Sequence, residues 1–391
     1  MNRARFNSGI FILEGLNAVS TAFYFNYLFF FLRIQFGFSS FHNLLVCALN
    51  GFLYMFAAYY GGRFGQKRGY MKALGLGLVI MLVAMIVGYG SRTIPGTIAA
   101  MVIWTLGVCL TWPNLEALTC DHQDPKKLPR IIGLYNVVWS GGGAIAYFSG
   151  GAIAEAFGWR SIYWIPATIF AIELVLVIIL SAAWKRICVE QEKNPFPHDD
   201  EHHPEGPKFL KMAWLANPFA YIAMNAAIPL IPDLANRLGL SAKQAGFFCS
   251  IWFFSRMTTF AILALWQNWH YRFLYLVLSY AGMLASFAAM LLLNSLWMIV
   301  LVQISFGWCV GLIYYSSLYY SMHVGETKGE HGGFHEAAIG AGIFGGPAIG
   351  AASLYLLPHV KGSSVYGVAA VLLIGLVGLI RIKGSRQTRS E

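Results

Sequence analysis

Long apolar runs alternate with short polar connections along the whole chain. Each run holds 18 or more residues with few charges, which is enough for a helix to cross about 30 Å of hydrocarbon. The pattern predicts an all-α membrane protein with twelve transmembrane helices. We place them at residues 9–33, 41–61, 72–90, 95–118, 131–153, 161–182, 211–235, 243–265, 272–292, 296–320, 333–356 and 363–382.

One connection is much longer than the others. Residues 183–210 are polar and contain prolines, so they predict a linker between an N-terminal six-helix bundle, 1–182, and a C-terminal bundle with a short tail, 211–391. Within it, the segment 197–206 is rich in His and acidic residues. We expect a solvated tether there rather than a metal site.

Composition and charge agree with a membrane protein. Of the 391 residues, 58% are hydrophobic and 11% charged, whereas a soluble domain has about 25% charged residues. If the N-terminus is cytoplasmic, twenty of the 27 Lys and Arg lie on the cytoplasmic side and six outside. The positive-inside rule then places both termini in the cytoplasm. The net charge of +10 therefore indicates topology and contact with membrane lipids, and we expect no nucleic-acid partner.

The two halves of the sequence repeat one another. An offset of 200 residues superposes Gly107 on Gly307, Cys109 on Cys309, Leu118 on Leu318, Gly133 on Gly333, Gly142 on Gly342 and Gly150 on Gly350. Near the start of each half the offset is 202, which aligns Gly37 with Gly239, Ser39 with Ser241 and Cys47 with Cys249. The register predicts two pseudo-symmetric bundles, with a binding site near the bilayer midplane where they meet.

Three stretches resemble the major facilitator superfamily of secondary transporters. They are the glycine-rich basic connection "GGRFGQKRGYMK" (61–72), "AEAFGWRSIYWIPATIF" (154–170) and "GAGIFGGPAIGAAS" (340–353). The resemblance implies that the first and third help to gate the protein. Gly62, Lys67, Gly69 and Lys72 fit the first motif, and Gly346, Pro347 and Gly350 fit the third. Our candidates for gating are Gly62, Gly65, Lys67, Gly69, Gly346 and Pro347. The glycines permit tight turns and close helix approach.

The sequence also departs from the family pattern. Gln66 stands where the family's loop has an Asp, and Tyr147 stands where its exporters have a Pro. The fourth predicted helix lacks the Arg that is typical of proton-driven drug exporters. These departures favour a transporter other than a drug exporter.

Polar side chains inside apolar helices are costly, so they are candidates for function. The resemblance implies that helices 1, 4, 7 and 10 line a central cavity, with 2, 5, 8 and 11 beside them. Our candidates for substrate binding are Arg256, Asn17, Tyr24, Asn50, Tyr54, Asn136, Asn225, Trp252, Gln303, Tyr314 and Ser317. Any of the amides and hydroxyls could instead bond a neighbouring helix, and the tyrosines could be packing residues.

We expect proton coupling through Glu14, with Glu336 and His335 as further candidates. Helix depth places Glu14 level with Arg256 to within one turn, which predicts that they pair. Glu336 and His335 could equally cap the start of their helix. Glu116, Glu155 and Asp233 lie near predicted helix ends, where we expect them to reach water, and Glu173 is expected to have a structural pairing.

The sequence thus predicts a secondary transporter that moves a small polar or anionic solute by alternating access, with the proton as coupling ion. A drug-like or lipid-like exporter and a non-transporting sensor or scaffold on the same fold are the alternatives. No motif indicates an enzyme, a cofactor or a metal site, and the scattered cysteines look like packing residues. We expect a monomer in a bacterial cytoplasmic membrane.

The topology can be tested directly. Reporter fusions at residue 391 and within residues 190–205 are both expected to give a cytoplasmic signal. An extracytoplasmic signal from either fusion would contradict twelve helices with both termini inside.

Overall fold

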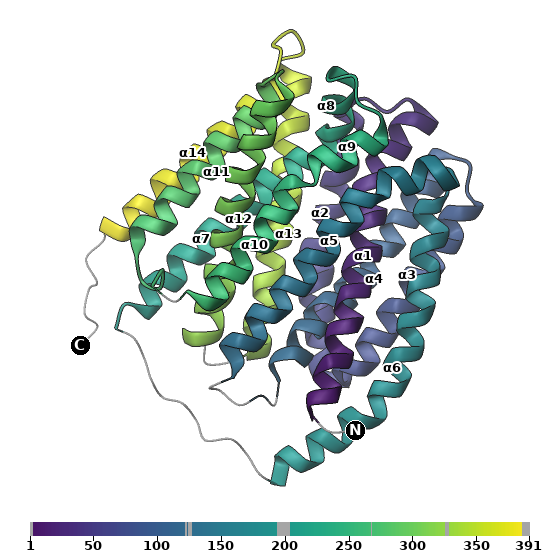
Figure 1. Ribbon diagram of the computed structural model, residues 1–391, viewed down its shortest axis with the longest axis vertical. Helices are drawn as coiled ribbons and strands as arrows, with labels where there is room; N and C mark the ends of the chain where they lie inside the picture. The colour runs from purple at the N-terminus through teal and green to yellow at the C-terminus, as the bar shows by residue number, and fades with distance from the viewer. Residues whose placement is uncertain are drawn as a thin grey trace.

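The computed structural model describes residues 3–121, 123, 127–193, 204–266, 268–324 and 328–384. All regular structure in these residues is helical (Figure 1). The helices are α1 (Arg3–Phe36), α2 (Ser40–Arg68), α3 (Tyr70–Gly90), α4 (Ile94–Cys120), α5 (Leu128–Phe157), α6 (Ser161–Lys193), α7 (Gly206–Ala227), η1 (Ile228–Leu230), α8 (Ile231–Arg237), α9 (Ala242–Cys249), α10 (Ile251–Leu265), α11 (Phe273–Leu292), α12 (Leu296–Val324), α13 (Lys328–Leu356) and α14 (Ser363–Gly384).

The prediction of twelve transmembrane helices in two six-helix bundles is confirmed. Twelve spans within the described residues are long and apolar enough to cross a membrane. Figure 1 shows α3, α4 and α6 on one side of the molecule and α7, α11 and α14 on the other, with α2, α5, α10 and α13 between them. Within the linker predicted at 183–210, α6 continues to Lys193 and α7 begins at Gly206. The segment 197–206 lies, up to residue 203, outside the described residues.

Two of the spans are broken helices. The seventh consists of α7, η1 and α8, because Pro229 and Pro232 lack the backbone N–H that a continuous helix needs. The eighth breaks at Ser250, between α9 and α10. There the side chain of Gln303 on α12 donates to the Phe248 carbonyl oxygen over 2.8 Å, so a carbonyl at the break is satisfied inside the protein.

The internal repeat is visible in the backbone. Gly37 and Gly239 both have positive φ, at 70° and 67°. Each is followed by an extended N-cap serine, Ser39 before α2 and Ser241 before α9, with a capping box on the next turn. The equivalent glycines Gly142 and Gly342 also have equivalent roles, because the first packs α5 on α1 and the second packs α13 on α7.

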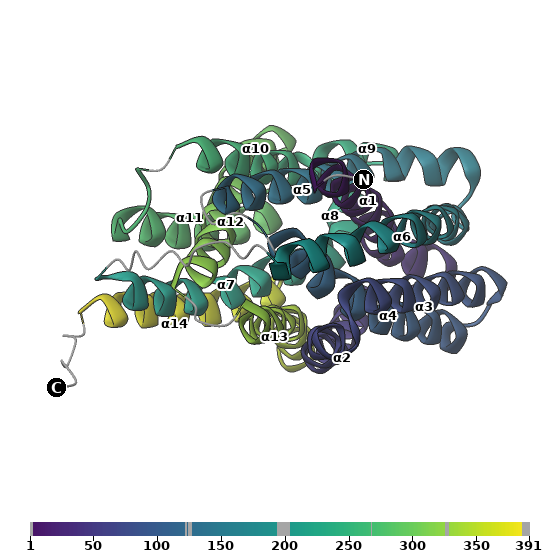
Figure 2. The same ribbon diagram turned by 90° about the horizontal axis from the view of Figure 1, so that it is seen from below.

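The two halves meet along two edges, which Figure 2 shows from below. At one edge α2 packs on α13, where a Cβ on Gly51 would overlap the backbone at Phe344. At the other edge α5 packs on α9 and α10, and a Cβ on Gly151 would overlap the Ala242 carbonyl. Small residues therefore let the backbones of the two halves touch.

The glycine–proline motif predicted in α13 lies at a close helix contact. A Cβ on Gly346 would overlap the carbonyl oxygen of Ile222 on α7, and Pro347 follows it inside α13. Both residues thus shape the packing within the C-terminal half. Their role in gating stays a prediction.

At one end of the molecule, the first turns of α1 and α7 lie beside the last turns of α4 and α14. Arg3 on α1 donates to the Asp121 carbonyl at the end of α4, over 2.5 Å. Lys208 near the start of α7 donates to the Lys383 carbonyl at the end of α14, over 2.8 Å. The start of α7 and the end of α14 therefore lie side by side at this end of the molecule.

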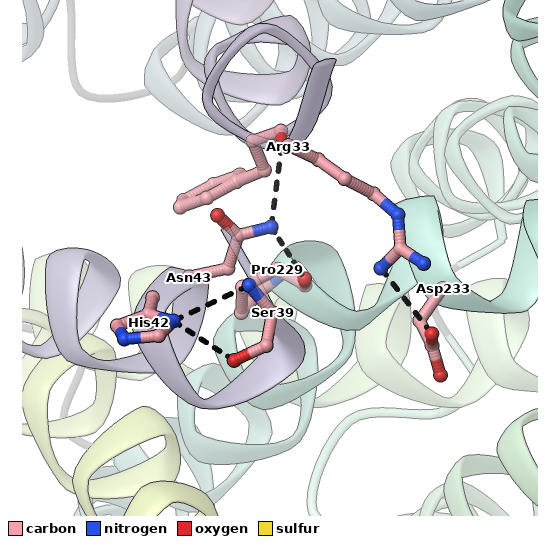
Figure 3. A network of polar contacts seen from close by, with 7 residues as sticks. Arg33, Ser39, His42, Asn43, Pro229 and Asp233 are labelled. Carbon is pink, nitrogen blue, oxygen red and sulfur yellow. Dashed lines mark hydrogen bonds and ion pairs between the residues drawn. The ribbon is translucent and has the colours of Figure 1, made fainter. Parts of the chain in front are cut away.

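The opposite end holds a polar network between the halves (Figure 3). Arg33 at the end of α1 and Asp233 on α8 form an ion pair at 3.2 Å. Asn43 of α2 is buried and donates to the carbonyls of Phe29 and Pro229, over 3.2 and 3.4 Å. We call Arg33, Asn43 and Asp233 the outer latch, because they join α1 and α2 to η1 and α8. Asp233 reaches water as expected, with 56% of its side chain exposed.

The basic connection between α2 and α3 is a one-residue turn at Gly69, whose φ is 99°. No atom outside its own neighbourhood lies within 4 Å of a Cβ built at Gly69. This glycine is therefore needed for its backbone conformation rather than for close packing. Gly62 is buried, whereas Lys67 is exposed on the last turn of α2.

Close packing of α2 occurs at two glycines that lie one and two helical turns before Gly69. A Cβ on Gly61 would overlap the carbonyl oxygen of Cys109 in α4, and one on Gly65 would overlap the side chain of Asn114. Pro113 lies inside α4 and leaves the Cys109 carbonyl, four residues before it, without a helical donor. Gly61 therefore lets α2 approach α4 where the α4 backbone is interrupted.

We expect Gly61→Ala to lower the thermal stability of the purified protein, because the added methyl group would overlap the Cys109 carbonyl. Gly90→Ala is the matched control, since nothing lies within 4 Å of its Cβ. At an open helical position the intrinsic preference favours Ala by up to about 1 kcal/mol. Equal melting temperatures for the two variants would show that α2 and α4 can separate freely.

Candidate functional site

A central cavity of about 130 Å³ lies between the two halves. Both halves line it, so it lies where the repeat predicts a binding site. Its polar lining consists of Thr21, Asn26, Asn50, Tyr54, Tyr221, Asn225 and Arg256. Aromatic side chains make up much of the rest: Phe25, Trp104, Trp112, Trp139, Trp252 and Phe253.

Arg256 is the charged residue in this lining, and α10 holds it at the cavity by packing on α12. A Cβ on Gly307 would overlap the Trp252 carbonyl, and one on Gly311 would lie 3.4 Å from the Arg256 Cγ. These two glycines of α12 let α10 approach closely. The side chain of Arg256 is 6% exposed.

Aromatic rings surround the guanidinium. Its carbon lies 4.5 Å from the ring centre of Trp139, 5.1 Å from Phe253 and 5.2 Å from Trp252. The rings provide cation–π attraction. One Nη donates to the Met224 sulfur over 3.5 Å, a weak acceptor, and Nε has no hydrogen-bond partner. Within the described residues Arg256 has no ion pair with a carboxylate.

A second, smaller hollow of about 20 Å³ adjoins the central cavity. Four aromatic residues line both spaces: Tyr54, Trp112, Trp139 and Tyr221. The second hollow also contains Glu116, Tyr135, Tyr314, Glu336 and Ile339. These residues lie toward the helix ends that share a side with the N-terminus. We call this second hollow the acidic layer.

Two tyrosine–carboxylate bonds cross the acidic layer between the halves. Tyr54 of α2 donates to an oxygen of Glu336 on α13. Tyr314 of α12 donates to an oxygen of Glu116 on α4, over 3.4 Å. Each half thus supplies one donor and one acceptor. Glu116 is only 8% exposed. The expectation that it reaches water was therefore wrong. Although Glu116 lies near the end of α4, residues of α12 and α13 cover it.

Glu14 does not pair with Arg256 as predicted. Among the described residues its buried carboxyl group forms no ion pair, and its neighbours are Tyr135 and Glu336. Depth along the helices does not fix the position of the two residues around the cavity. Glu14 lies one helical turn before Ala18, which lines the central cavity, so it faces the acidic layer instead.

Several predicted substrate contacts are brought together by the fold. Asn50, Tyr54, Asn225, Trp252 and Arg256 line the central cavity. Tyr314 and Glu336 line the acidic layer. Asn50 also donates to the Thr105 hydroxyl over 2.7 Å.

The other predicted contacts are buried away from both spaces. Tyr24 packs on Trp104, with ring centres 5.0 Å apart, and Gln303 bonds the backbone at the α9–α10 break. Asn17, Asn136 and Ser317 are fully buried outside the two linings. The side chain of His335 lies outside the described residues.

Several lining residues were not among the candidates from the sequence, although their four-residue spacing marks one face of a helix. Four lining pairs stand four residues apart, so that both members share a helix face. They are Trp112 with Glu116, Tyr135 with Trp139, Tyr221 with Asn225, and Trp252 with Arg256. Pairing an aromatic residue with a polar residue at this spacing would have identified the faces of α4, α5 and α7.

Comparison with known proteins identifies the family. The sequence profile of the Major Facilitator Superfamily matches residues 10–212, more than half of the chain. The chain belongs to the Major Facilitator Superfamily. The solved structure of the human organic anion transporter MFSD10 (TETRAN) superposes with a TM-score of 0.71. It covers 97% of this chain and 100% of that chain at 13% identity, a likeness that shows the superfamily fold alone.

Curated members of the superfamily match shorter segments. The methylenomycin A resistance protein of Bacillus subtilis (strain 168) is 31% identical over 114 residues, which are 29% of this chain and 24% of that protein. The riboflavin transporter RfnT of Brucella anthropi is 26% identical over 128 residues, 32% of each chain. The matches thus span only a quarter to a third of these relatives.

The Tyr54–Glu336 bond can be tested by a double-mutant cycle. Tyr54→Phe and Glu336→Gln are each expected to reduce stability, by about 1–3 kcal/mol for a buried bond to a carboxyl group. The double variant should lose less stability than the sum of the losses of the two single variants, because both changes remove the same interaction. Thermal unfolding in detergent measures all three.

The control is Tyr366→Phe, since Tyr366 is 53% exposed on α14. Its stability should equal that of the wild type. Strict additivity in the cycle would mean that the two side chains do not interact in solution.

Proposed function

We propose that this chain is a secondary transporter that moves a small polar or anionic organic solute across a bacterial cytoplasmic membrane by alternating access, coupled to protons. The observation that carries the proposal is Arg256, a buried cation that lines a cavity between the two halves and has no carboxylate partner among the described residues. We place both termini in the cytoplasm, as the distribution of Lys and Arg indicates.

The environment of Arg256 favours an anionic ligand. A guanidinium at membrane depth costs at least about 2.5–3.5 kcal/mol unless an anion or water compensates it. Here its nearest contacts are aromatic faces and a thioether. Its Nε–H group has no protein acceptor, so a carboxylate or similar anion in the cavity would supply one.

The arrangement of gates supports alternating access. On the side away from the termini, the outer latch and the Gly151 contact join the two halves. On the other side, the acidic layer separates the central cavity from the cytoplasmic helix ends. Release toward the cytoplasm would require the Tyr54–Glu336 and Tyr314–Glu116 bonds to break.

The same acidic layer supports proton coupling. Glu14, Glu116 and Glu336 lie near one another, with Tyr135 between them. Three ionised carboxylates at membrane depth would repel one another and any anion in the cavity next to them. Protonation removes that repulsion, so anion and protons should bind together. His335 stays a prediction in this role.

A second candidate function has one observation in its favour. The central cavity is lined by four tryptophans and two phenylalanines, a surface that suits a drug-like or lipid-like compound. The matched relatives are named as a resistance protein and a riboflavin transporter. For an uncharged aromatic substrate, Arg256 would only shape the cavity, and its charge would be dispensable. A sensor or scaffold would bind a ligand without transporting it.

The test is a thermal-shift screen of purified protein against small organic anions, at pH 6 and pH 8. We expect at least one anion to stabilise the wild type, more strongly at pH 6. Arg256→Gln should abolish that stabilisation while leaving a folded, monodisperse protein. Glu14→Gln and Glu336→Gln should retain binding but lose its dependence on pH.

The matched control is Arg92→Gln, since Arg92 is exposed at the start of a connection. It should respond to the anion like the wild type. The same anions are then assayed for uptake into proteoliposomes with an imposed pH gradient. Normal binding and transport by Arg256→Gln would remove the anion preference and favour the drug-like alternative. Binding without transport would favour a sensor.

A further inference from the structure

The lining of the central cavity carries a single charge. Among the described residues that form it, Arg256 is the one Lys or Arg, and no Asp or Glu is present. Glu116 and Glu336 line the acidic layer instead, and Tyr54 and Trp139 border both spaces. Arg256 therefore matches a ligand with one negative charge. A second negative charge would have no cation in the lining to pair with, which makes its burial costly.

Most polar side chains of the lining already donate hydrogen bonds within the protein. Thr21, Asn26 and Asn225 each donate to a backbone carbonyl of their own helix, over 2.6, 2.8 and 3.0 Å. Asn50 donates to a side chain of α4, and Tyr54 donates to one of α13. A sugar-like solute, which must replace many hydrogen bonds to water, would find few free donors here. Recognition of a ligand is therefore left mainly to Arg256 and to the aromatic rings.

The aromatic rings of the lining form two groups. Trp139, Trp252 and Phe253, from α5 and α10, contact the guanidinium at between 4.5 and 5.2 Å. Phe25 of α1 and Trp104 of α4 stack on each other, with ring centres 5.8 Å apart and planes inclined by 14°. The first group surrounds the charge, and the second adds apolar ring surface from other helices to the same cavity.

The volume of the cavity suits a ligand with one ring. It measures about 130 Å³, and an apolar protein cavity of about 150 Å³ accommodates benzene. A fused two-ring body is too large for a space of this size. The lining thus offers one cation, aromatic surface and room for a single ring.

We infer that the solute is an aromatic monocarboxylate with one ring, its carboxylate at Arg256 and its ring against the aromatic lining. The inference rests on the proposed function, since it names the class of anion that the same cavity would carry. The guanidinium provides charge-assisted hydrogen bonds to the carboxylate. Contact between aromatic rings strengthens binding by about two- to tenfold beyond the burial of apolar area, a gain that a saturated ring does not have.

The test compares matched compounds by thermal shift of the purified full-length protein at pH 6. Benzoate is expected to stabilise the wild type in a saturable way, and to bind about two- to tenfold more tightly than cyclohexanecarboxylate, which carries the same charge on a saturated ring. Terephthalate adds a second carboxylate, benzamide has no charge, and naphthoate has a second ring. Each of these three should bind more than about tenfold more weakly than benzoate.

A variant of the lining tests the role of the rings. Phe25→Leu should remove the preference for benzoate over cyclohexanecarboxylate, because it replaces a ring of the lining by an aliphatic side chain, while binding of cyclohexanecarboxylate is retained. Phe56→Leu is the matched control, since Phe56 is 51% exposed on α2, and it should keep the wild-type preference. Arg256→Gln should lose binding of both carboxylates.

Equilibrium dialysis of the wild type with radiolabelled benzoate gives a measurement that does not depend on any variant folding. About one benzoate per chain is expected, and no bound benzoate would overturn the inference. Terephthalate or acetate binding as tightly as benzoate, with the binding lost in Arg256→Gln, would overturn the aromatic monocarboxylate and leave the proposed anion transporter standing. Benzamide binding as tightly as benzoate, unchanged in Arg256→Gln, would overturn both.

Discussion

Contact between the helix backbones of the two halves is the constraint on which the rest of the structure depends. In an apolar solvent, helices associate through packing rather than through the hydrophobic effect, so small residues decide where they touch. Gly51 at the α2–α13 edge and Gly151 at the α5–α9 edge allow that touch. Because the halves meet along these two edges, the space that remains between them is the central cavity.

The second organising feature is the separation of charge across a layer of aromatic rings. Arg256 lies on the cavity side, Glu116 and Glu336 lie on the other side, and Trp139 and Tyr221 border both spaces. The rings stand between the guanidinium and the carboxylates, and among the described residues Arg256 forms no ion pair with either of them. Both sets of charges therefore act strongly on whatever enters the cavity, since electrostatic interactions strengthen in a low dielectric.

The fold was predictable because its signals are long and redundant. Twelve apolar runs and a repeat of glycines specify the helices and their pairing, and both survive errors of a few residues. The capped glycine turns at Gly37 and Gly239 show why the repeat could be recognised: the backbone conformation there requires the same residues in both halves. The breaks at Pro229 and Ser250 altered these helices without changing the number of spans.

The site was only partly predictable, because rotation about a helix axis is not fixed by an apolar sequence. Glu14 and Arg256 were expected to pair, but Glu14 lies beside Tyr135 and Glu336, whereas Arg256 lies beside Trp139. Glu116 was assigned to water from its position along α4, whereas the partner half covers it. Asn17 shares its helix with cavity residues but faces α6. Packing against helices that are distant in the sequence decides these orientations. The sequence of a single helix does not contain that information.

The repeat has a further consequence at the centre of the molecule, where its symmetry is broken. In the repeat, the offset of 202 residues aligns Tyr54 with Arg256, and the offset of 200 residues aligns Asn136 with Glu336. In both pairs the neutral residue belongs to the first half and the charged residue to the second. The two halves are parallel repeats about an axis along the membrane normal, so a molecule between two identical halves could lie in two equivalent orientations. Here Arg256 stands on one side only, and the two orientations of a charged or dipolar molecule in the cavity must differ in energy.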